Sequence, residues 1–477
     1  MTTMKILGIK NINLQKAIPF VFLFLLGSCT NECKNKVTEI GLSAPGRNTL
    51  KVQVDVKTSA PIDTYIEYWR TDSAAQIFTS TVSKQNSSHR FVLTNLQPQQ
   101  RYEYRVVTKK DDCSAESKTY NFSTPAYPMW FQEFFKIICP QPEKLPASFK
   151  EGSMLIYRRD EPGILFLINH KGDIRWYHQV NGTGFKVAHF TQNKTLLSIL
   201  GSHEYETSYG NEILEVSLTG DTLLHLKKGM NDFEQTIHHE ILLNPANQVV
   251  TLCVEERTFD LRSRGGGIAD TVKGDGILVL DRQGKQVFKW TVFDDVDPLA
   301  DNEILKTKKD WMHANSVTFD KDGNYLISFY NNGQIWKINA KTGKLMWKFG
   351  KNGDFAMPED GIFDQAHCVH INNRGELMFF DNGVSKRQSR TLAFKLDEAN
   401  KRAEIAINTK LPTDIYNERM GSSYLLENKY LLQCCSKKNS VVLTDMNGIY
   451  VWLLQTGLLP YRVEFIPKEL LEPYIVN

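Results

Sequence analysis

The feature that most constrains this chain is a repeated pair of β-hairpins, which begins near residue 150 and continues almost to the C-terminus. Segments such as "GQIWKINAKTGKLMWKFG" consist of two apolar strands around a Gly-containing turn. Most of them follow a second hairpin, such as "HANSVTFDKDGNYLIS". Two hairpins make a four-stranded unit, and repeated units of about fifty residues are typical of β-propeller blades. Six units can be counted, so we predict an all-β fold with a six-bladed β-propeller over residues 150–477.

Three histidines occupy the start of three successive units. His313 and His367 are 54 residues apart, whereas His239 lies 74 residues before His313 because of an inserted loop. The innermost strand of each blade lines the central channel, so residues that open these strands gather at one mouth. We therefore predict a site formed by His239, His313 and His367. His189 is a weaker member of this set, and strand alternation places His238 on the opposite face, behind the site.

The neighbours of these histidines indicate which ligand the site prefers. Three imidazoles could bind zinc or iron. However, Asn315 lies two residues after His313 and is therefore expected on the same strand face, which carries no carboxylate. Imidazolium and amide groups donate hydrogen bonds, which suits a tetrahedral oxyanion such as sulfate or phosphate better than a cation. We predict an anionic small-molecule substrate and no metal ion.

Two long segments, "DWMHANSVTFDKDGNYLISFYNNGQIWKINAKTGKLMWKFG" and "FDQAHCVHINNRGELMFFDNG", resemble the bacterial aryl-sulfate sulfotransferases. The resemblance covers about residues 150–465. It implies a six-bladed propeller that needs no nucleotide sulfate donor or other cofactor, and that moves a sulfuryl group from an aryl sulfate donor to a phenolic acceptor. It also implies that His367 is the nucleophile and forms a sulfohistidine, while His313, Asn315 and His239 contact the sulfate.

The chain departs from this family at one position of the expected site. Tyr330 stands where the family usually has an arginine, and losing one donor to a developing oxyanion typically costs about 2–4 kcal/mol. Lys186 and Arg419 are candidate replacement cations, although residues of this kind are more often surface charges. Ser422 opens the last unit and is expected at the channel mouth. Tyr330 and Ser422 therefore join Asn315 as predicted substrate-binding residues.

Two other functions stay open on the sequence alone. Water could take the place of the phenol, which would make the protein an aryl sulfate hydrolase. Because Tyr330 carries no charge, the propeller could also be a weakened or non-catalytic domain that binds a sulfated or phenolic ligand. Product formation with and without a phenolic acceptor separates transferase from hydrolase, and the substitution Tyr330→Arg tests the weakened form.

Residues 1–29 have the pattern of a lipoprotein signal peptide. Several lysines precede the apolar run "AIPFVFLFLL", which is too short to span a bilayer as a helix. The run ends in "LGSC", so Cys29 is expected to carry the lipid. We therefore expect an exported protein that is lipid-anchored to a membrane of the cell envelope, at the outer membrane or periplasmic face. A plain secretory signal or a membrane anchor is the alternative.

Residues 37–125 predict a separate small β-sandwich. Short alternating strands are divided by turn residues, and "LTNLQPQQRYEYRVV" resembles the fibronectin type III signature, with Tyr102 at the sandwich corner. Residues 126–149 are predicted to link this domain to the propeller. The net charge of +3 and the lack of a basic tail argue against a nucleic-acid partner.

Overall fold

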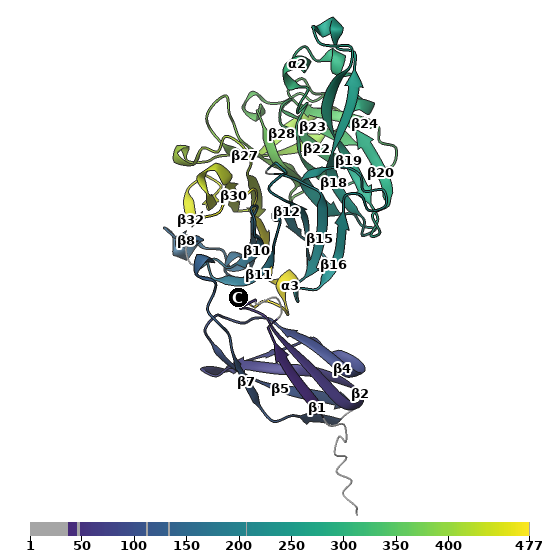
Figure 1. Cartoon of the computed structure of the whole chain (residues 1–477). Coiled ribbons are helices and arrows are strands. Elements are labelled where there is room, and N and C mark those ends of the chain that lie inside the picture. The colour runs from purple at the N-terminus through teal and green to yellow at the C-terminus, as the bar shows by residue number, and fades with distance from the viewer. Residues whose placement is uncertain (1–36, 45–47, 111–112, 132–133, 207, 477) are drawn as a thin grey trace, which may run out of the picture.

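The computed structural model describes residues 37–44, 48–110, 113–131, 134–206 and 208–476 and shows two β domains (Figure 1). The N-terminal domain lies below the larger C-terminal domain in that view, and the end of the chain returns to the junction between them. The predicted signal peptide, residues 1–29 with Cys29, lies outside the described residues. Among the helices within those ranges, none is long and apolar enough to cross a membrane.

The N-terminal domain is the predicted β-sandwich, and the long strand β2 (Val52–Arg70) connects its seven strands into one hydrogen-bonded network. The first half of β2 pairs with β1 (Val37–Ser43) and β4 (Ser83–Leu93), and the second half with β3 (Ser73–Thr79) and β5 (Arg101–Lys110). The strands β6 (Cys113–Glu116) and β7 (Tyr120–Ser123) pair with β5. Tyr102 is buried, and its hydroxyl accepts a hydrogen bond of 2.8 Å from the backbone N–H of Gln97, as in a tyrosine corner.

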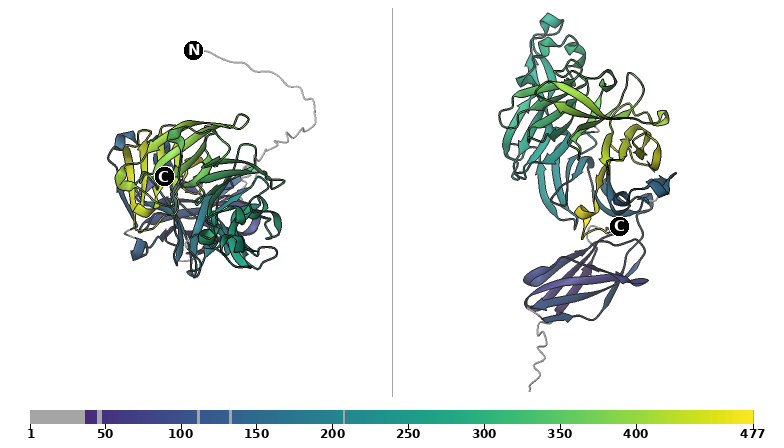
Figure 2. Two further views of the ribbon diagram at one scale, coloured as in Figure 1. Left: turned by 90° about the horizontal axis from the view of Figure 1, so that it is seen from above. Right: turned by 180° about the vertical axis from the view of Figure 1, so that it is seen from behind.

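The sandwich lies against one side of the propeller (Figure 2), and polar contacts hold the two domains together. The side chain of Asn95 accepts from the backbone N–H of Val476 at 2.6 Å and donates to the carbonyl of Pro473 at 3.2 Å. The hydroxyl of Tyr177 accepts from the backbone N–H of Thr49 at 2.7 Å. The C-terminal residues therefore serve as part of the joint between the domains.

Six antiparallel sheets form the C-terminal domain, as predicted. From the channel outward, blade 1 contains β33 (Glu464–Ile466), β9 (Ser153–Arg158), β10 (Gly163–Ile168) and β11 (Ile174–Val180), and blade 2 contains β12 (Gly184–Phe190), β13 (Thr195–Gly201), β15 (Glu212–Ser217) and β16 (Thr222–Lys227). Blade 3 contains β14 (Tyr209–Gly210), β17 (Ile237–Leu243), β18 (Val249–Phe259), β19 (Asp270–Leu280) and β20 (Gln286–Thr291). Blade 4 contains β21 (Ala314–Phe319), β22 (Tyr325–Phe329), β23 (Gln334–Ile338) and β24 (Leu345–Gly350), and blade 5 contains β25 (Ala366–Ile371), β26 (Leu377–Asp381), β27 (Arg390–Asp397) and β28 (Arg402–Lys410). Blade 6 contains β29 (Ser422–Leu426), β30 (Tyr430–Cys435), β31 (Ser440–Asp445), β32 (Tyr450–Thr456) and β8 (Phe135–Ile138).

Both ends of the propeller sequence interlock in the ring. The C-terminal strand β33 supplies the innermost strand of blade 1 by pairing with β9. At the other end, residues 126–149 do more than link the domains, because they include β8, which pairs with β32 at the outer edge of blade 6. These two pairings close the ring non-covalently and cover sheet edges that would otherwise be open.

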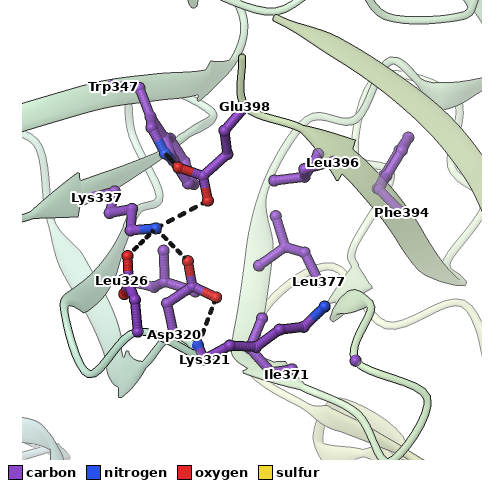
Figure 3. A pocket seen from close by; sticks show the side chains of 12 residues that line it. Asp320, Lys321, Leu326, Lys337, Trp347, Ile371, Leu377, Phe394, Leu396 and Glu398 are labelled. Atoms are coloured by element: carbon purple, nitrogen blue, oxygen red, sulfur yellow. Dashed lines mark hydrogen bonds and ion pairs between the residues drawn. The ribbon is translucent and has the colours of Figure 1, made fainter. Parts of the chain in front are cut away.

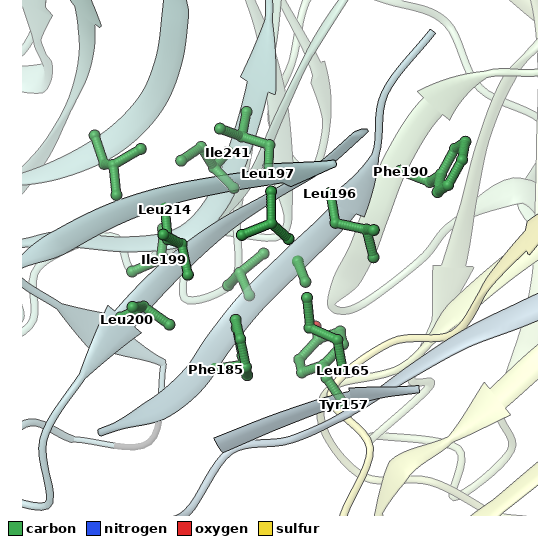
Figure 4. Packing of buried hydrophobic residues seen from close by; sticks show 14 of the residues in the cluster. Tyr157, Leu165, Phe185, Phe190, Leu196, Leu197, Ile199, Leu200, Leu214 and Ile241 are labelled. Carbon is green, nitrogen blue, oxygen red and sulfur yellow. The ribbon is translucent and has the colours of Figure 1, made fainter. Parts of the chain in front are cut away.

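Hairpin turns and apolar strand faces explain why this sequence forms blades. In blade 4, the N–H of Asp320 donates to the carbonyl of Asn324 at 2.8 Å across the turn, and Gly323 supplies the left-handed conformation with a φ of 80°. Between blades, Leu165 of β10, Phe185 of β12 and Ile241 of β17 belong to one buried cluster (Figure 4). Burying one such side chain contributes about 1.5–3 kcal/mol.

The long spacing before His313 corresponds to an insertion of short helices at the top of Figure 1. Between β20 and β21 lie η5 (Val292–Asp294), η6 (Pro298–Ala300) and α2 (Ile304–Thr307). The other short helices are η2 (Met129–Phe131), η3 (Pro142–Lys144), α1 (Ala147–Glu151), η4 (Arg262–Arg264), η7 (Glu359–Gly361), η8 (Thr413–Ile415), η9 (Ser436–Lys438) and α3 (Lys468–Leu471). The insertion thus lies in the same connection that delivers His313.

One lysine joins blades 4 and 5 through three carboxylates (Figure 3). The ammonium of Lys337 is buried and lies 2.6 Å from Asp320, 2.7 Å from Asp322 and 2.8 Å from Glu398. Glu398 also accepts a hydrogen bond of 2.9 Å from the indole of Trp347. Burial alone would lower the pKa of Lys337, but the three carboxylates raise it, so the ammonium stays charged.

We expect Lys337→Met to lower the free energy of unfolding by about 1–3 kcal/mol at neutral pH, because three carboxylates lose their shared cation while two of them stay partly exposed. Although burial opposes it, the hydrogen bond from Lys337 lowers the pKa of Asp322, so the stabilisation that the lysine provides is lost as acid protonates this carboxyl group. The loss in the free energy of unfolding, relative to the wild type, should therefore become smaller as the pH falls below about 5. Chemical denaturation at several pH values measures this, and Lys321→Met, at an exposed lysine beside the same cluster, is the matched control. A deficit that grows toward acid pH would contradict the assignment.

Candidate active site

A pocket of about 300 Å³ lies where the predicted histidines open their strands. It is lined by Arg159, Ser208, His239, Asp310, His313, Tyr330, Asn331, His367, Arg419, Met420, Leu459 and Tyr461. The structure thus brings together His239, His313, His367 and Tyr330, which come from three blades. Asn315 and Ser422, the other two predicted site residues, do not belong to this lining.

The aromatic rings of the pocket form a row. The ring centroids of His239 and His313 are 5.0 Å apart, and the Tyr330 ring lies 5.6 Å from that of His313 and 5.3 Å from that of His367. All three pairs meet edge to face. Tyr330 therefore lies between His313 and His367, and its hydroxyl donates to the carbonyl of Glu418 at 3.3 Å.

Unusual backbone conformations deliver the histidines to the pocket. His239 has a φ of 58°, His313 a φ of 54°, and Cys368, directly after His367, a φ of 54°. Non-glycine residues adopt this left-handed region at a cost of about 1–3 kcal/mol, and such residues are concentrated at functional sites. The strand pairing is also irregular at these places, between His238 and Ile241 and between His367 and His370.

The same irregularity removes Asn315 from the pocket, contrary to the sequence prediction. The register of β21 shifts between Ala314 and Ser316, so Asn315 is a bulge and simple alternation from His313 fails. Its buried amide donates to the carbonyl of Ala366 at 2.8 Å and accepts from Ser328 at 2.5 Å. Asn315 thus joins blades 4 and 5 beneath the pocket.

His367 is held by Asn382 in one tautomer. The amide nitrogen of Asn382 donates to the carbonyls of Asn417 and Met420, at 2.8 and 2.9 Å. Its Oδ1 therefore faces Nδ1 of His367 at 2.6 Å and accepts a hydrogen bond from it. With the proton on Nδ1, the lone pair of neutral His367 is on Nε2. Burial lowers the pKa of His367 to about 3, so the imidazole is neutral at neutral pH.

His313 has the opposite electrostatic environment. Burial alone would lower its pKa, but the carboxylate of Asp310, 2.7 Å from Nδ1, outweighs burial and raises the pKa of His313 above its usual value. The imidazolium form can therefore donate from Nε2 while Nδ1–H binds Asp310. The pKa values of His367 and His313 are displaced in opposite directions, as suits a nucleophile and an acid.

His239 is neutral and is supported from behind by a second histidine. Burial, together with the nearby His313, lowers its pKa well below the usual value. Nδ1 of His239 lies 2.8 Å from Nδ1 of the buried His238, and Nε2 of His238 lies 3.4 Å from Asp275. His238 is therefore behind the site, where strand alternation places it. Asp275 also accepts from the N–H of Ala314 at 2.9 Å, which connects blades 3 and 4.

Below the pocket, a buried network of charges crosses the channel. Arg462, just before β33, pairs with Glu240 of β17 and donates to the carbonyl of Asn315 at 2.6 Å. Glu240 also binds Nε2 of His189 at 2.5 Å, and Nδ1 of His189 lies 3.2 Å from Glu464. These carboxylates outweigh burial and raise the pKa of His189 to about 10. His189 thus belongs to the channel network and does not line the pocket.

Two arginines line the pocket, and sequence analysis identified one of them. Arg419, a predicted candidate, is exposed at the rim. Arg159, which follows β9 and was not predicted, is buried; its guanidinium donates to Ser208 at 2.7 Å and lies 5.0 Å from the Tyr461 ring. Lys186 is buried and lines an adjoining pocket, so the expectation of a surface charge there was wrong.

Ser422 has a different place from the one predicted. Its buried hydroxyl donates to the carbonyl of Val463 at 3.2 Å and accepts from the N–H of the same residue at 3.2 Å. The serine therefore holds blade 6 against the segment that closes the ring at blade 1. Sequence position alone placed it at the mouth, but the contact with Val463 occupies its hydroxyl.

A protein-family model described as Arylsulfotransferase (ASST) matches residues 140–447. The chain belongs to the arylsulfotransferase family. The matched range contains the six blades apart from β8 and the C-terminal segments, and it includes every pocket residue except Leu459 and Tyr461. A second family model, described as the N-terminal domain of purple acid phosphatase, matches residues 42–124, which form the sandwich. Among curated proteins, none matches this chain.

Solved structures similar to this arylsulfotransferase-family chain are distant. A protein of unknown function from Bacteroides caccae is 13% identical, with a TM-score of 0.42, over 66% of this chain and 99% of that one. Virginiamycin B lyase from Staphylococcus aureus is 11% identical, with a TM-score of 0.35, over 70% of this chain and 88% of that one. No functional argument follows from similarity at this level.

Sequence reasoning missed Asp310, Asn382 and Arg159 in this arylsulfotransferase domain, and Asp310 brings a carboxylate to a site that was expected to have none. Asn382 lies in "FDNG", within the segment that carries the family resemblance, so a signal was present. Arg159 lies in blade 1, outside the histidine-bearing repeats, and no motif marks it. Within the described ranges, no group of three or more His, Cys, Asp or Glu side chains is arranged to hold a metal ion.

We expect Asp310→Asn to lower the pKa of His313, because burial would then act without the carboxylate that opposes it. Titration of the His313 imidazole by NMR in histidine-labelled protein measures this without any turnover. The matched control is Asp360→Asn, at an exposed carboxylate outside the pocket, which should leave the pKa of His313 unchanged. An unaltered His313 titration in Asp310→Asn would refute the assigned partnership.

Proposed function

We propose that this chain transfers a sulfuryl group from an aryl sulfate to a phenol through a sulfohistidine on Nε2 of His367. The observation that carries the proposal is the pairing of a neutral imidazole, oriented by Asn382, with a second imidazole whose pKa Asp310 raises, in one pocket. Membership in the arylsulfotransferase family supports the same chemistry.

In the first half-reaction, the Nε2 lone pair of His367 attacks sulfur while the bond between sulfur and the phenolic oxygen breaks. The departing phenolate takes the proton from Nε2 of His313, and Asp310 keeps Nδ1 of His313 protonated. His367 keeps the proton on Nδ1 and continues to donate it to Oδ1 of Asn382. The positive charge that develops on the ring therefore lies beside a carbonyl oxygen.

In the second half-reaction, the oxygen of the acceptor phenol attacks sulfur and the N–S bond breaks. His313, now neutral at Nε2, takes the proton of the acceptor phenol as the new bond forms. This returns His367 to its neutral form and His313 to its protonated form. The donor phenol leaves from the same place that the acceptor phenol then occupies. The first product must therefore depart before the acceptor binds, which makes the mechanism ping-pong.

Arg159 is our candidate for the cation that the family usually supplies at position 330. It is buried in the pocket and keeps its charge, although burial lowers its pKa, because a guanidinium does not lose its proton in proteins. Charge-assisted donors are the strong partners of sulfuryl oxygens. The proposal assigns Arg159, His239 and the hydroxyl of Tyr330 to the non-bridging oxygens of the substrate.

We also propose that the protein is exported and lipid-anchored in the cell envelope through Cys29. The support is the sequence pattern alone: a lysine-flanked apolar run that ends in "LGSC". Mass spectrometry of the mature N-terminus tests it, because an unmodified or differently placed first residue would exclude this anchor.

We expect His367→Ala to reduce transfer from a chromogenic aryl sulfate to phenol by at least about 10³-fold, because the nucleophile is lost. Donor-treated wild-type protein without acceptor should gain one sulfuryl group, which peptide mass spectrometry should locate on His367. His225→Ala, at an exposed histidine on blade 2, is the control and should retain activity. Sulfation elsewhere would disprove the mechanism, and product that is independent of acceptor would indicate a hydrolase.

The replacement of the family arginine generates a separate prediction. We expect Arg159→Gln to lower kcat by about 10²–10³-fold, the usual effect of losing one donor to a developing oxyanion, with partial recovery in Arg159→Lys. Tyr330→Arg should then bring little gain in kcat. A large gain in Tyr330→Arg together with normal turnover in Arg159→Gln would instead mean that the site is weakened by the missing arginine.

A further inference from the structure

A second pocket of about 420 Å³ adjoins the histidine site. The two pockets share Arg159 and Leu459 in their linings, so they are adjacent. The mechanism proposed above uses none of the other residues of this second pocket. If a substrate enters the second pocket, these residues therefore contact the part of it that does not react.

Lys186 is one of the charged residues that line the second pocket. It is 4% exposed, yet it forms no hydrogen bond or ion pair with a described residue. Within the described chain, most other buried charges have partners, as Lys337 has with three carboxylates. The Lys186 ammonium is not among the fully enclosed side-chain nitrogens that lack a partner, so it faces the open pocket, where an anion can bind it.

The position of Lys186 in its blade repeats that of two site histidines. Lys186 precedes the first residue of its hairpin turn, Thr191, by the same interval as His239 precedes Asn244 and His367 precedes Asn372. In all three strands the pairing register shifts at this place. Lys186 therefore opens the inner strand of its blade as the histidines open theirs, and it lines the pocket beside theirs.

One wall of the second pocket is aromatic and apolar. Trp130 and Phe134 come from the segment before β8, and their rings meet edge to face at 5.7 Å. Trp130 is 42% exposed, which is high for a tryptophan packed beside a cavity. The guanidinium of Arg158 lies 5.7 Å from the Trp130 ring. A flat aromatic ligand can stack on this surface, as aromatic side chains do with one another.

The charges of the second pocket favour anions. Among its lining residues, Arg158, Arg159 and Lys186 are positive, and Asp160 is the carboxylate that opposes them. Burial, and then the charge of Arg159, lower the pKa of Lys186, so a bound anion would favour its charged form. An aromatic wall beside an excess of cations is suited to an acidic aromatic molecule.

We propose that the second pocket holds the non-reacting part of the aryl substrate and selects phenols and aryl sulfates that carry a second anionic group. The inference rests on the proposed transferase function, because it extends the same site. Since the leaving phenol and the accepting phenol occupy one place, the selection applies to both. Lys186 is then a specificity-determining residue, which binds the second anionic group and takes no part in sulfuryl transfer.

The kinetic test compares two acceptors of equal shape, a hydroxybiphenyl carboxylate and its carboxamide, with one chromogenic donor. In the wild type, kcat/KM should be at least about tenfold higher for the carboxylate, mainly through KM, as expected for one charge-assisted contact. Lys186→Met should reduce this ratio to about one, and Lys186→Arg should keep most of it. Lys285→Met, at an exposed lysine elsewhere, is the control and should keep the wild-type ratio.

A binding test separates this inference from the transferase mechanism. Calorimetry with the His367→Ala protein should show the carboxylate binding at least about tenfold more tightly than the carboxamide, with no turnover required. The preference should be lost when Lys186→Met is added. Absence of transfer with this binding preference intact would refute the mechanism and leave the pocket assignment standing. Equal affinity for the two ligands, no binding of the carboxylate, or an unchanged preference in Lys186→Met would overturn the pocket assignment.

Discussion

The buried ion pair between Arg462 and Glu240 is the interaction on which the rest of the site depends. Arg462 belongs to the segment that closes the ring, Glu240 to blade 3, and the same guanidinium binds a backbone carbonyl of blade 4 at Asn315. Glu240 also forms an ion pair with His189 of blade 2. Removing one member would leave an uncompensated charge inside the channel, at a cost of about 3–5 kcal/mol. The network therefore fixes the inner strands of four blades relative to one another.

Above this network, the pocket combines three imidazoles with different partners. Asn382 offers His367 a neutral acceptor, Asp310 offers His313 a charge, and His238 stands behind His239. Burial lowers the pKa of every one of these rings, and only the carboxylate beside His313 reverses the effect. One pocket can therefore contain an imidazole that attacks and an imidazolium that donates. Arg159 and Lys186 add positive charge on the side of blades 1 and 2.

The repeats in the sequence were a reliable guide to the blades and to the histidines. Hairpin periodicity predicted the six blades, and the equivalent starts of three strands predicted that His239, His313 and His367 meet. It failed for Asn315 and Ser422, because a bulge and a ring-closing contact turn these polar side chains toward other blades. Lys186 was misread as a surface charge, since an isolated lysine in a sequence gives no sign of the cavity that surrounds it.

By itself, the sequence determined the fold class, the two domains and the set of histidines, because these follow from short-range alternation and from equivalence between repeats. Only the tertiary structure decided which nitrogen of His367 carries the lone pair, which histidine is charged, and that Arg159 and Lys186 lie beside the site. Those properties depend on contacts between blades that are distant in the chain. Alternation within one strand carries no information about such contacts, particularly where a bulge interrupts it.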